Sequence, residues 1–388
     1  MEHAASRTAE RVRGRDVLAI QDTTELVFGG RRARKQGFGP VGKGGAIGGL
    51  LLHPVVAVEV ETGAVLGLAG AEVWNRTAKV KHRRSRATAE KESRRWLAGA
   101  ESAGRVLQEA ARITVVADRE SDVYEAFARR PANVHMITRA AQDRLIEDGT
   151  RIFTHVDGLA ERDRIRVTIP AAPGRAEREA LLALRFAPIT LRAPLHGSKK
   201  LPQTLPLSIV DLREVEAAPG VKPVHWRLLT THTVDTLADA RMVVDFYRQR
   251  WTIERYFRTL KTGAFDLEDA DIGDPEVMSR FVAAVAVAAV TVMQLVQARD
   301  GLTDQRLEDA FDPEDAPLIE ALSCELEGKT ARQKNPHTKG SLAFATWVIA
   351  RLGGWTGYYG KPGSLVVRRG LHDFQRIRMG AKLRFRDV

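Results

Sequence analysis

Two short apolar runs in the first third of the chain each end on an aspartate. Val17–Gln21 is followed by Asp22, and Ile113–Ala117 is followed by Asp118. Runs of this length that are rich in Val and Ile predict buried β-strands. Between them, two longer stretches alternate in strand fashion around a Thr-Gly pair, which is typical of a hairpin turn. These stretches are Leu50–Val60 and Ala64–Val73, on either side of Thr62-Gly63.

Helical and extended patterns alternate after this hairpin. A helix is predicted to end near Ala111, a second one covers Ser121–Arg130 before Pro131, and Val134–Thr138 predicts another strand. Strands followed by alternating helices and strands are typical of an α/β domain with a mixed sheet. We therefore expect an α/β fold.

The pattern changes at about residue 142. Up to residue 231, short β-branched stretches alternate with Pro and Gly, which predicts a β-rich insertion. A helix is predicted from Leu237 to Gly263 with Thr236 or Asp235 as its N-cap, and the chain beyond Glu276 has a mostly helical pattern. The expected organisation is a first part of the α/β core (1–141), the insertion (142–231), a second part of the core (232–300) and a helical C-terminal region (301–388).

Charge and composition narrow the class of protein. The 388 residues carry a formal net charge of +11 and a pI near 9.9, so the expected partner is a polyanion, above all nucleic acid. The single cysteine, Cys324, excludes a disulfide framework and a Cys-rich metal centre. The polar start of the chain is unlike a signal peptide, and the apolar run Phe281–Met293 is too short to span a bilayer and predicts a buried helix. These features predict a cytoplasmic protein.

The two strand-terminal aspartates are candidate metal ligands. In an open α/β sheet, ligands bind beyond the carboxyl ends of the strands. If the strands before Asp22 and Asp118 are parallel neighbours, their carboxylates meet at one edge, where oxygen ligands suit Mg²⁺ or Mn²⁺ and two such ions can promote chemistry at a phosphodiester. The alternative is that each aspartate simply begins the next turn.

The predicted helix over residues 237–262 carries a second group of polar side chains. At about 100° per residue, four of them fall on one stripe: Tyr247, Arg250, Glu254 and Lys261. The apolar residues on the adjacent arc would face the core: Met242, Phe246, Ile253, Tyr256, Phe257 and Leu260. A carboxylate flanked by cations and a phenol can bind a metal ion while its neighbours hold phosphates. The alternative is a solvated face with an ion pair between Arg250 and Glu254.

The spacing Y-x2-R-x3-E-x6-K in YRQRWTIERYFRTLK resembles the signature of the DDE transposases of the insertion-sequence-four type, which include the Tn-five-like enzymes. Three other strings are similar to that family: IQDTTEL, ADRESD and IARLGGW. The resemblance runs from about residue 16 to about residue 375. It implies that Asp22, Asp118 and Glu254 form a catalytic, metal-binding triad.

The resemblance further implies a ribonuclease-H-like (retroviral-integrase-like) core that a β-strand insertion interrupts. Such enzymes use Mg²⁺ or Mn²⁺, two ions per active site, to cut DNA at transposon ends and to join the freed ends to target DNA, in some members through a hairpin. The implied partners are the terminal inverted repeats and target DNA, bound by a homodimer in a bacterial, nucleoid-associated complex. Tyr247, Arg250, Lys261 and Arg119 would contact DNA.

Trp226 lies 28 residues before Glu254, where hairpin-forming relatives place an aromatic residue that stacks on a flipped-out base. Extruding a base costs a few kcal/mol and a stacking platform returns about 1–3 kcal/mol, so an aromatic residue suits this task. The alternative is a tryptophan that fills the core beside the strand Leu228–Thr230.

Basic segments supply the other candidate DNA contacts. The string GFGPVGKGG (37–45) has Gly44 where a P-loop needs Ser or Thr, and it leads into a strand, so we predict no nucleotide cofactor. The glycine-rich loop instead suits DNA phosphates through Arg31, Arg32, Arg34, Lys35 and Lys43. A second basic cluster over residues 76–95 includes Arg76, Lys79, Lys81, Arg83, Arg84 and Arg86, and a third lies in the C-terminal tail.

The chain departs from the family in its first residues. Relatives carry an N-terminal helical domain that recognises transposon ends, whereas Asp22 here lies 21 residues from Met1. This leaves an alternative function, an N-terminally shortened, non-catalytic regulator that dimerises with the full transposase. In either case the resemblance suggests Ser341–Gly354 as a dimer contact.

Overall fold

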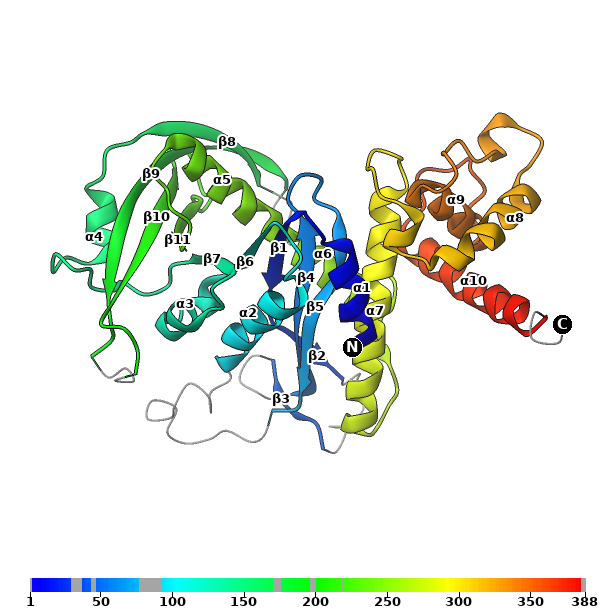
Figure 1. Ribbon diagram of the computed structural model, residues 1–388, viewed down its shortest axis with the longest axis horizontal. Coiled ribbons are helices and arrows are strands. Elements are labelled where there is room, and N and C mark those ends of the chain that lie inside the picture. The colour runs from blue at the N-terminus through cyan, green and yellow to red at the C-terminus, as the bar shows by residue number, and fades with distance from the viewer. Residues whose placement is uncertain are drawn as a thin grey trace.

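A single twisted sheet organises the molecule in the computed structural model, which describes residues 2–28, 37–42, 47–76, 93–169, 176–195, 200–217 and 219–384 (Figure 1). Within these residues the sheet has eleven strands. They are β1 (Asp16–Gln21), β2 (Thr24–Val27), β3 (Gly39–Val41), β4 (Ile47–Glu59), β5 (Val65–Trp74), β6 (Arg112–Ala117), β7 (Val134–Arg139), β8 (Asp163–Ile169), β9 (Arg178–Arg192), β10 (Thr204–Glu214) and β11 (His225–Thr230).

The strand order places β1 and β6 at the centre of the sheet. The order is β2-β4-β1-β6-β7-β11-β10-β9-β8, with β3 and β5 paired to β4. The pairs β1–β6 and β6–β7 are parallel, and the other pairs are antiparallel. The sheet is therefore mixed, as the sequence predicts. The strands between residues 142 and 231 belong to this same sheet, because β11 pairs with β7.

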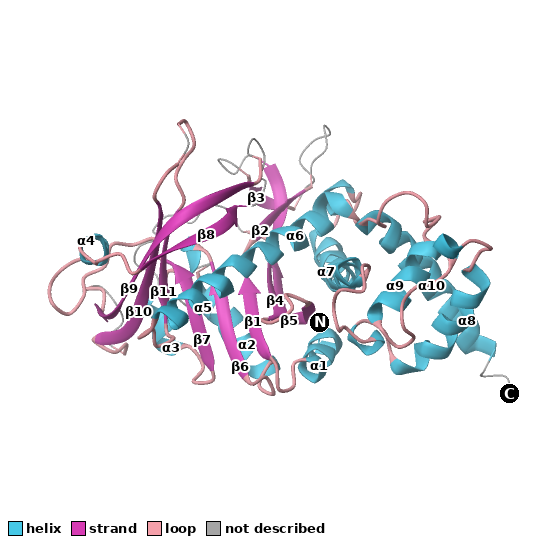
Figure 2. Ribbon diagram, turned by 90° about the horizontal axis from the view of Figure 1, so that it is seen from above, coloured by secondary structure: helices cyan, strands magenta, loops and turns pink. Residues whose placement is uncertain are grey.

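Helices cover both faces of the sheet and form a separate group beyond it (Figures 1 and 2). They are α1 (Glu2–Arg11), α2 (Arg94–Val106), α3 (Tyr124–Arg129), α4 (Ile152–Asp157), α5 (Leu237–Arg248), α6 (Thr252–Arg258), α7 (Pro275–Ala298), α8 (Ala316–Leu326), α9 (Leu342–Leu352) and α10 (Ser364–Arg384).

Side chains that alternate along β1 pack into the hydrophobic cores on both faces of the sheet. Leu18 and Ile20 belong to the core cluster that also contains buried residues of α5, α6 and α7. Val17 and Ala19 belong to the cluster on the other face, with residues of α2 and α3. Because successive side chains of a strand point to opposite faces, β1 supplies both cores. Its end is therefore fixed from both sides.

The helix predicted over residues 237–263 is confirmed as one continuous run of helical turns. A 3₁₀ turn (Gln249–Trp251) joins α5 to α6, and a π-helical turn (Thr259–Gly263) follows α6. Thr236 is the N-cap, since its side chain accepts a hydrogen bond from the Asp239 amide while the Asp239 carboxylate accepts one from the Thr236 amide. The predicted apolar arc is largely buried in the core: Phe246, Ile253, Tyr256 and Leu260.

The long apolar helix α7 connects the sheet to the C-terminal helices. It is long and apolar enough to cross a membrane, but it packs against β5 on one side and α9 and α10 on the other. Val282, Ala286 and Leu295 are among its fully buried residues. It is a core helix, which confirms the prediction made from residues 281–293.

Three features differ from the expectations. Residues 2–11, for which no helix is predicted, form α1, which packs against β5. The helix before β6 ends at Val106, about one turn before Ala111, and the chain continues through a turn in which the Ala110 amide donates to the Leu107 carbonyl. The β-rich segment contains β9, which has fifteen residues and is longer than the short stretches expected there.

Candidate active site

Asp22 and Asp118 lie at the ends of two neighbouring parallel strands. β1 ends at Gln21 and β6 ends at Ala117, and Ile20 is paired with Val116. Continuing this register by two residues places Asp22 opposite Asp118. The arrangement satisfies the condition under which the sequence predicts a shared site at the carboxyl edge of the sheet.

Arg250 connects this edge to Glu254. Its Nη1 lies 3.5 Å from Asp22 Oδ2, and its Nη2 donates to Glu254 Oε1 at 2.9 Å. The Arg250 residue is only 8% exposed, whereas the Glu254 side chain is 44% exposed. The i,i+4 ion pair of the alternative interpretation is therefore present, but its cation is buried beside the strand ends and does not lie on a solvated face.

Tyr247 contacts the second aspartate. Its hydroxyl lies 3.4 Å from Asp118 Oδ1, and its ring packs edge-on against Trp226, with ring centroids 5.4 Å apart. Burial, and then the charge of Asp118, raises the pKa of Tyr247 to about 12. The phenol is therefore a neutral hydrogen-bond donor at ordinary pH.

Electrostatics at this edge disfavour an ionised Asp22. Burial raises the pKa of Asp22 to about 6, and the charges of Asp118 and Glu120 add to the effect. A hydrogen bond from the Thr23 amide (2.7 Å) and the charge of Arg250 act in the opposite direction without cancelling it. Burial also acts to lower the pKa of Arg250, but the neighbouring acidic groups raise it: Tyr247, Asp118, Glu254 and Asp22.

A buried hydrogen-bond network supports the residue after Asp22. The Thr23 hydroxyl lies 2.9 Å from His53 Nδ1, and His53 Nε2 lies 3.1 Å from Gln21 Oε1. Burial, and then the charge of Arg95, lowers the pKa of His53 to about 3, so the imidazole is neutral. It therefore donates through Nε2 to the Gln21 amide oxygen and accepts the Thr23 hydroxyl proton at Nδ1.

Arg95 joins the loops that follow β1 and β6. Its Nε donates to Thr23 Oγ1 at 2.7 Å, and its Nη2 donates to Glu120 Oε2 at 2.7 Å. The guanidinium also lies over the Trp96 ring, 5.2 Å from its centroid. Sequence analysis did not find His53 and Arg95 as site residues, because their contacts span 30 and 72 positions and no motif joins them.

The fit to a divalent cation rests on the chemistry of the donors. Asp22 and Asp118 end neighbouring strands and Arg250 joins Asp22 to Glu254, so the available donors are carboxylate oxygens, the kind that Mg²⁺ and Mn²⁺ prefer. Across the described ranges, no group of three or more His, Cys, Asp or Glu side chains lies close enough together to hold a metal ion. In this arrangement the Glu254 carboxylate is directed to Arg250.

Lys261 and Trp226 have other contacts. Lys261 Nζ donates to the Glu25 carbonyl at 2.5 Å and lies 3.3 Å from Glu268 Oε1. Trp226 is 8% exposed and belongs to the core cluster, where its ring contacts Tyr247. Arg119 is exposed next to Asp118. The predicted DNA-contact role of each of these residues remains a prediction.

Most of the predicted basic contacts lie outside the described residues. These are Arg31, Arg32, Arg34, Lys35, Lys43, Lys79, Lys81, Arg83, Arg84 and Arg86, together with the side chain of Arg384 and residue Arg386. Arg76 lies 3.5 Å from Glu25 Oε1. In the tail, Arg378 pairs with Asp312 and Asp315, and Lys382 lies 3.8 Å from Glu314.

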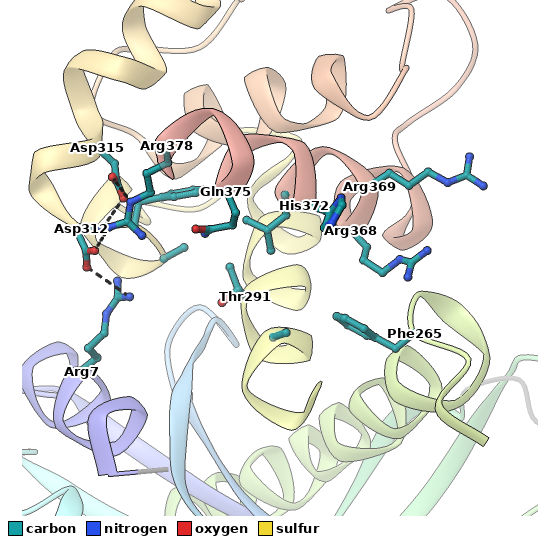
Figure 3. Close-up of a pocket in the computed structure, with 14 residues that line it drawn as sticks. Arg7, Phe265, Thr291, Asp312, Asp315, Arg368, Arg369, His372, Gln375 and Arg378 are labelled. Carbon is teal, nitrogen blue, oxygen red and sulfur yellow. Dashed lines mark hydrogen bonds and ion pairs between the residues drawn. The ribbon is translucent and has the colours of Figure 1, made fainter. Parts of the chain in front are cut away.

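A large cavity lies away from these carboxylates. It measures about 560 Å³ and separates α1 from α10, with Thr291 of α7 at its back (Figure 3). Arg7 and Arg378 approach Asp312 and Asp315 on one side, and Phe265 lies on the other (Figure 3). None of the candidate carboxylates lines this cavity.

A comparison with protein families gives an independent assignment for most of this structure. The family described as "Transposase DDE domain" matches residues 52–291, well over half of the chain. The matched segment runs from β4 into α7 and contains Asp118 and Glu254, and it begins after Asp22. The mixed α/β sheet is consistent with the ribonuclease-H-like fold that such a domain implies.

Proposed function

The chain belongs to the transposase DDE domain family, and from this premise we propose that it is a DNA transposase of the insertion-sequence-four type with Asp22, Asp118 and Glu254 as its triad. The proposed reaction is metal-dependent cleavage of transposon ends followed by strand transfer. The observation that carries the proposal is the parallel pair β1–β6, which ends with Asp22 opposite Asp118.

The three carboxylates would hold Mg²⁺ or Mn²⁺, two ions per active site and no nucleotide. When bound, such ions polarise the scissile phosphate, activate the attacking water or hydroxyl and stabilise the leaving oxygen. The chain contributes the ligands at fixed strand ends. Release of Glu254 from Arg250 would free its carboxylate for a cation and the guanidinium for a phosphate oxygen.

The proposed roles of the remaining stripe follow from charge and burial. Arg250 and Lys261 would bind phosphates of the strand that is cut, and the neutral Tyr247 hydroxyl would orient the same strand. Trp226 would support Tyr247 by edge-on packing and, if a hairpin forms, would stack on an extruded base. The proposed partners are transposon terminal repeats and target DNA, bound by a homodimer.

The test is cleavage of a plasmid that carries the element's terminal repeats, with Mg²⁺ or Mn²⁺ supplied and with chelator as control. Wild type is compared with Asp118→Asn and Glu254→Gln, which keep the size of each side chain. The proposal expects metal-dependent cuts at the repeats that both substitutions abolish. Cuts at random positions would indicate a general nuclease instead.

If the folded protein binds the repeats but does not cleave them, the result would contradict the proposal of an enzyme and would support the alternative function as a regulator. That alternative has its own test, in which the chain is added to an active transposase of the same element. Reduced transposition, unchanged by Asp118→Asn, would identify an inhibitor that acts by forming mixed dimers. Unchanged transposition would contradict the regulator as well.

A further inference from the structure

A second cavity lies among the C-terminal helices, outside the residues matched to the family. It measures about 250 Å³ and is bounded by the end of α7, the loop after α8, the helix α9 and the loop that precedes α10. The lining residues that matter here are cationic or aromatic: Arg299, Arg332, Lys334, His337, Trp347 and Trp355.

The lining of this cavity is positively charged, and Arg299 is the one of its cations that has a nearby carboxylate among the described residues, Asp300. Three of its lining residues are cations and none is a carboxylate. In the described part of the chain, neither Arg332 nor Lys334 has an ion pair. The larger cavity of Figure 3 differs, because Asp312 is paired there with Arg7 and Arg378. An anion is therefore the expected ligand of the smaller cavity.

Arg299 adds a buried donor to this wall. Its Nη1 donates to the Pro362 carbonyl at 3.0 Å, whereas its Nε is buried without a hydrogen-bond partner among the described residues. The nearby carboxylate of Asp300 lies 3.9 Å from Nε and is bound to Lys361 at 2.9 Å. A buried unpaired donor is costly, and an acceptor atom from a ligand would satisfy it.

The aromatic walls are held rigidly. Trp355 Nε1 donates to the Gly360 carbonyl at 3.0 Å, and the Trp355 carbonyl accepts from Arg351 Nη1 at 2.9 Å. The same guanidinium lies over the Trp347 ring, 5.6 Å from its centroid. Trp347 is only 4% exposed, whereas the Trp355 indole is held in place by the Gly360 carbonyl, so the Trp355 ring is positioned before any ligand arrives, which lowers the ordering cost of binding.

The cationic wall is fixed to the aromatic one by backbone packing. Gly357 has a φ of +87°, and a Cβ atom there would lie 2.6 Å from the Arg332 carbonyl oxygen, so only glycine allows this approach. The Tyr358 hydroxyl lies 2.7 Å from Thr330 Oγ1 and forms a second connection. Arg332 and Trp355 thereby line the same small cavity.

We propose that this cavity binds one unpaired nucleotide of a DNA strand, with the base against a tryptophan and the phosphate against Arg332, Lys334 and Arg299. A planar aromatic ring attached to a phosphate matches both walls, and the volume suits one nucleotide and excludes duplex. The choice of DNA as the source of that nucleotide rests on the proposed function. The binding itself needs neither the carboxylates nor a metal ion.

The experiment measures binding of a short fluorescent single-stranded oligothymidine to the full chain by anisotropy, in chelator so that no cleavage can occur. A strand of equal length with abasic residues tests the base, and an excess of inorganic phosphate tests the anion. The variants are Trp355→Leu and the double substitution Arg332→Ala with Lys334→Ala. The matched control is Lys329→Ala with Lys339→Ala, which removes two cations from the same loop that do not line the cavity.

The expected result is binding about tenfold weaker for Trp355→Leu and for the Arg332/Lys334 pair, as the loss of one stacked base or of two phosphate contacts predicts, with little change for the control pair. The abasic strand should bind wild type and Trp355→Leu equally. Where Trp355→Leu unfolds, Trp355→Phe replaces it and should retain the preference for a base.

Three results would overturn the proposal. Equal losses in the Arg332/Lys334 and Lys329/Lys339 pairs would indicate general electrostatic attraction. Equal affinity of wild type for abasic and normal strands would show that the cavity does not bind a base. Photo-crosslinking of a bromodeoxyuridine strand exclusively to residues 16–260 would place the strand elsewhere. Plasmid cleavage is measured in a separate experiment. A failure of the nucleotide-binding proposal can therefore be distinguished from a failure of the transposase proposal.

Discussion

Arg250 donates a hydrogen bond to Glu254, one helical turn further along the chain, at 2.9 Å. The guanidinium is buried and also lies 3.5 Å from Asp22, so one cation neutralises carboxylates from two different elements. A buried arginine in this position would be unstable without them, and the carboxylates would repel one another without it. Replacing Arg250 therefore tests the repulsion between the carboxylates, and replacing a carboxylate tests the cost of burying Arg250.

Arg250→Gln should destabilise the protein most strongly when divalent ions are absent. We expect the free energy of unfolding to fall by about 1–3 kcal/mol in chelator, because Asp22 and Glu254 lose their positive partner. Added Mg²⁺ should recover part of this loss by supplying positive charge. The measurement is urea unfolding with and without Mg²⁺. The control is Arg248→Gln, which removes an exposed pair with Asp245 and should cost less than about 0.5 kcal/mol.

Asp22→Asn should stabilise the protein at neutral pH and leave it unchanged at acid pH. The pKa of Asp22 is about 6 in the folded protein and 3.8 in the reference state, so the folded state binds the proton more tightly and wild type loses stability as pH rises from about 4 to about 6. Above that window the variant should be more stable by up to about 3 kcal/mol. Urea unfolding in chelator at pH 4 and pH 8 measures this difference, and a constant difference would contradict it.

Acid should weaken the fold through His232. Burial, and then the charge of His135, lowers the pKa of His232 to about 3, so the folded state excludes a proton that the unfolded state takes up below about 6.5. Stability due to this group is complete at pH 7 and falls by about 2 kcal/mol by pH 5. His232→Gln should flatten the dependence of unfolding free energy on pH, whereas the exposed His372→Gln should reproduce the wild-type curve.

Arg95→Lys should impair cleavage more than it impairs DNA binding. A single ammonium cannot reproduce the two guanidinium hydrogen bonds to Thr23 and Glu120, so the loops that carry Asp22 and Asp118 lose their common anchor. We expect the single-turnover cleavage rate to fall about tenfold, since small displacements of catalytic groups are costly. The repeat-DNA dissociation constant should stay within error. Arg94→Lys, an exposed neighbour on α2, serves as the control.

Trp226→Ala should be strongly destabilising whatever the role of the residue on DNA. The side chain is 8% exposed and packs against the Tyr247 ring, so truncation leaves a cavity that costs about 3–5 kcal/mol. Trp226→Phe keeps a ring against Tyr247 and should cost less. Urea unfolding of the two variants measures this. A small loss for Trp226→Ala would show that the ring leaves the core easily, as a base-stacking role requires.

The strand ends that carry Asp22 and Asp118 could be predicted because the sequence pattern that identifies them is local. The runs before Asp22 and Asp118 are mostly apolar, so both the strands and their final residues could be located, and the stripe on residues 247–261 followed from helical period alone. Their parallel pairing could only be stated as a condition. It depends on the hydrogen-bond ladder between β1 and β6, which joins residues 96 positions apart.

Burial and long-range contacts could not be predicted in the same way. An i,i+4 pair of Arg250 and Glu254 has the same pattern on an exposed helix and on one that docks against a strand end. The contact between Thr23 and Arg95 joins two unrelated segments, and neither segment has a motif for it. The residues of α9 from Leu342 to Ala350 are buried within the chain itself, so the dimer contact suggested at 341–354 offers a partner little surface.

The β1–β6 pair also explains why two of the three candidate carboxylates are aspartates and the third is a glutamate. Adjacent strands lie about 4.8 Å apart, so the backbones of residues 22 and 118 are held one inter-strand step from each other and the shorter side chain is long enough for both. Residue 254 lies on α6, in the helical layer, and its longer side chain reaches Arg250. The length of the side chain therefore matters at this edge. Asp22→Glu or Asp118→Glu would keep the negative charge but would move the carboxylate about one carbon–carbon bond, roughly 1.5 Å, too far from its strand end.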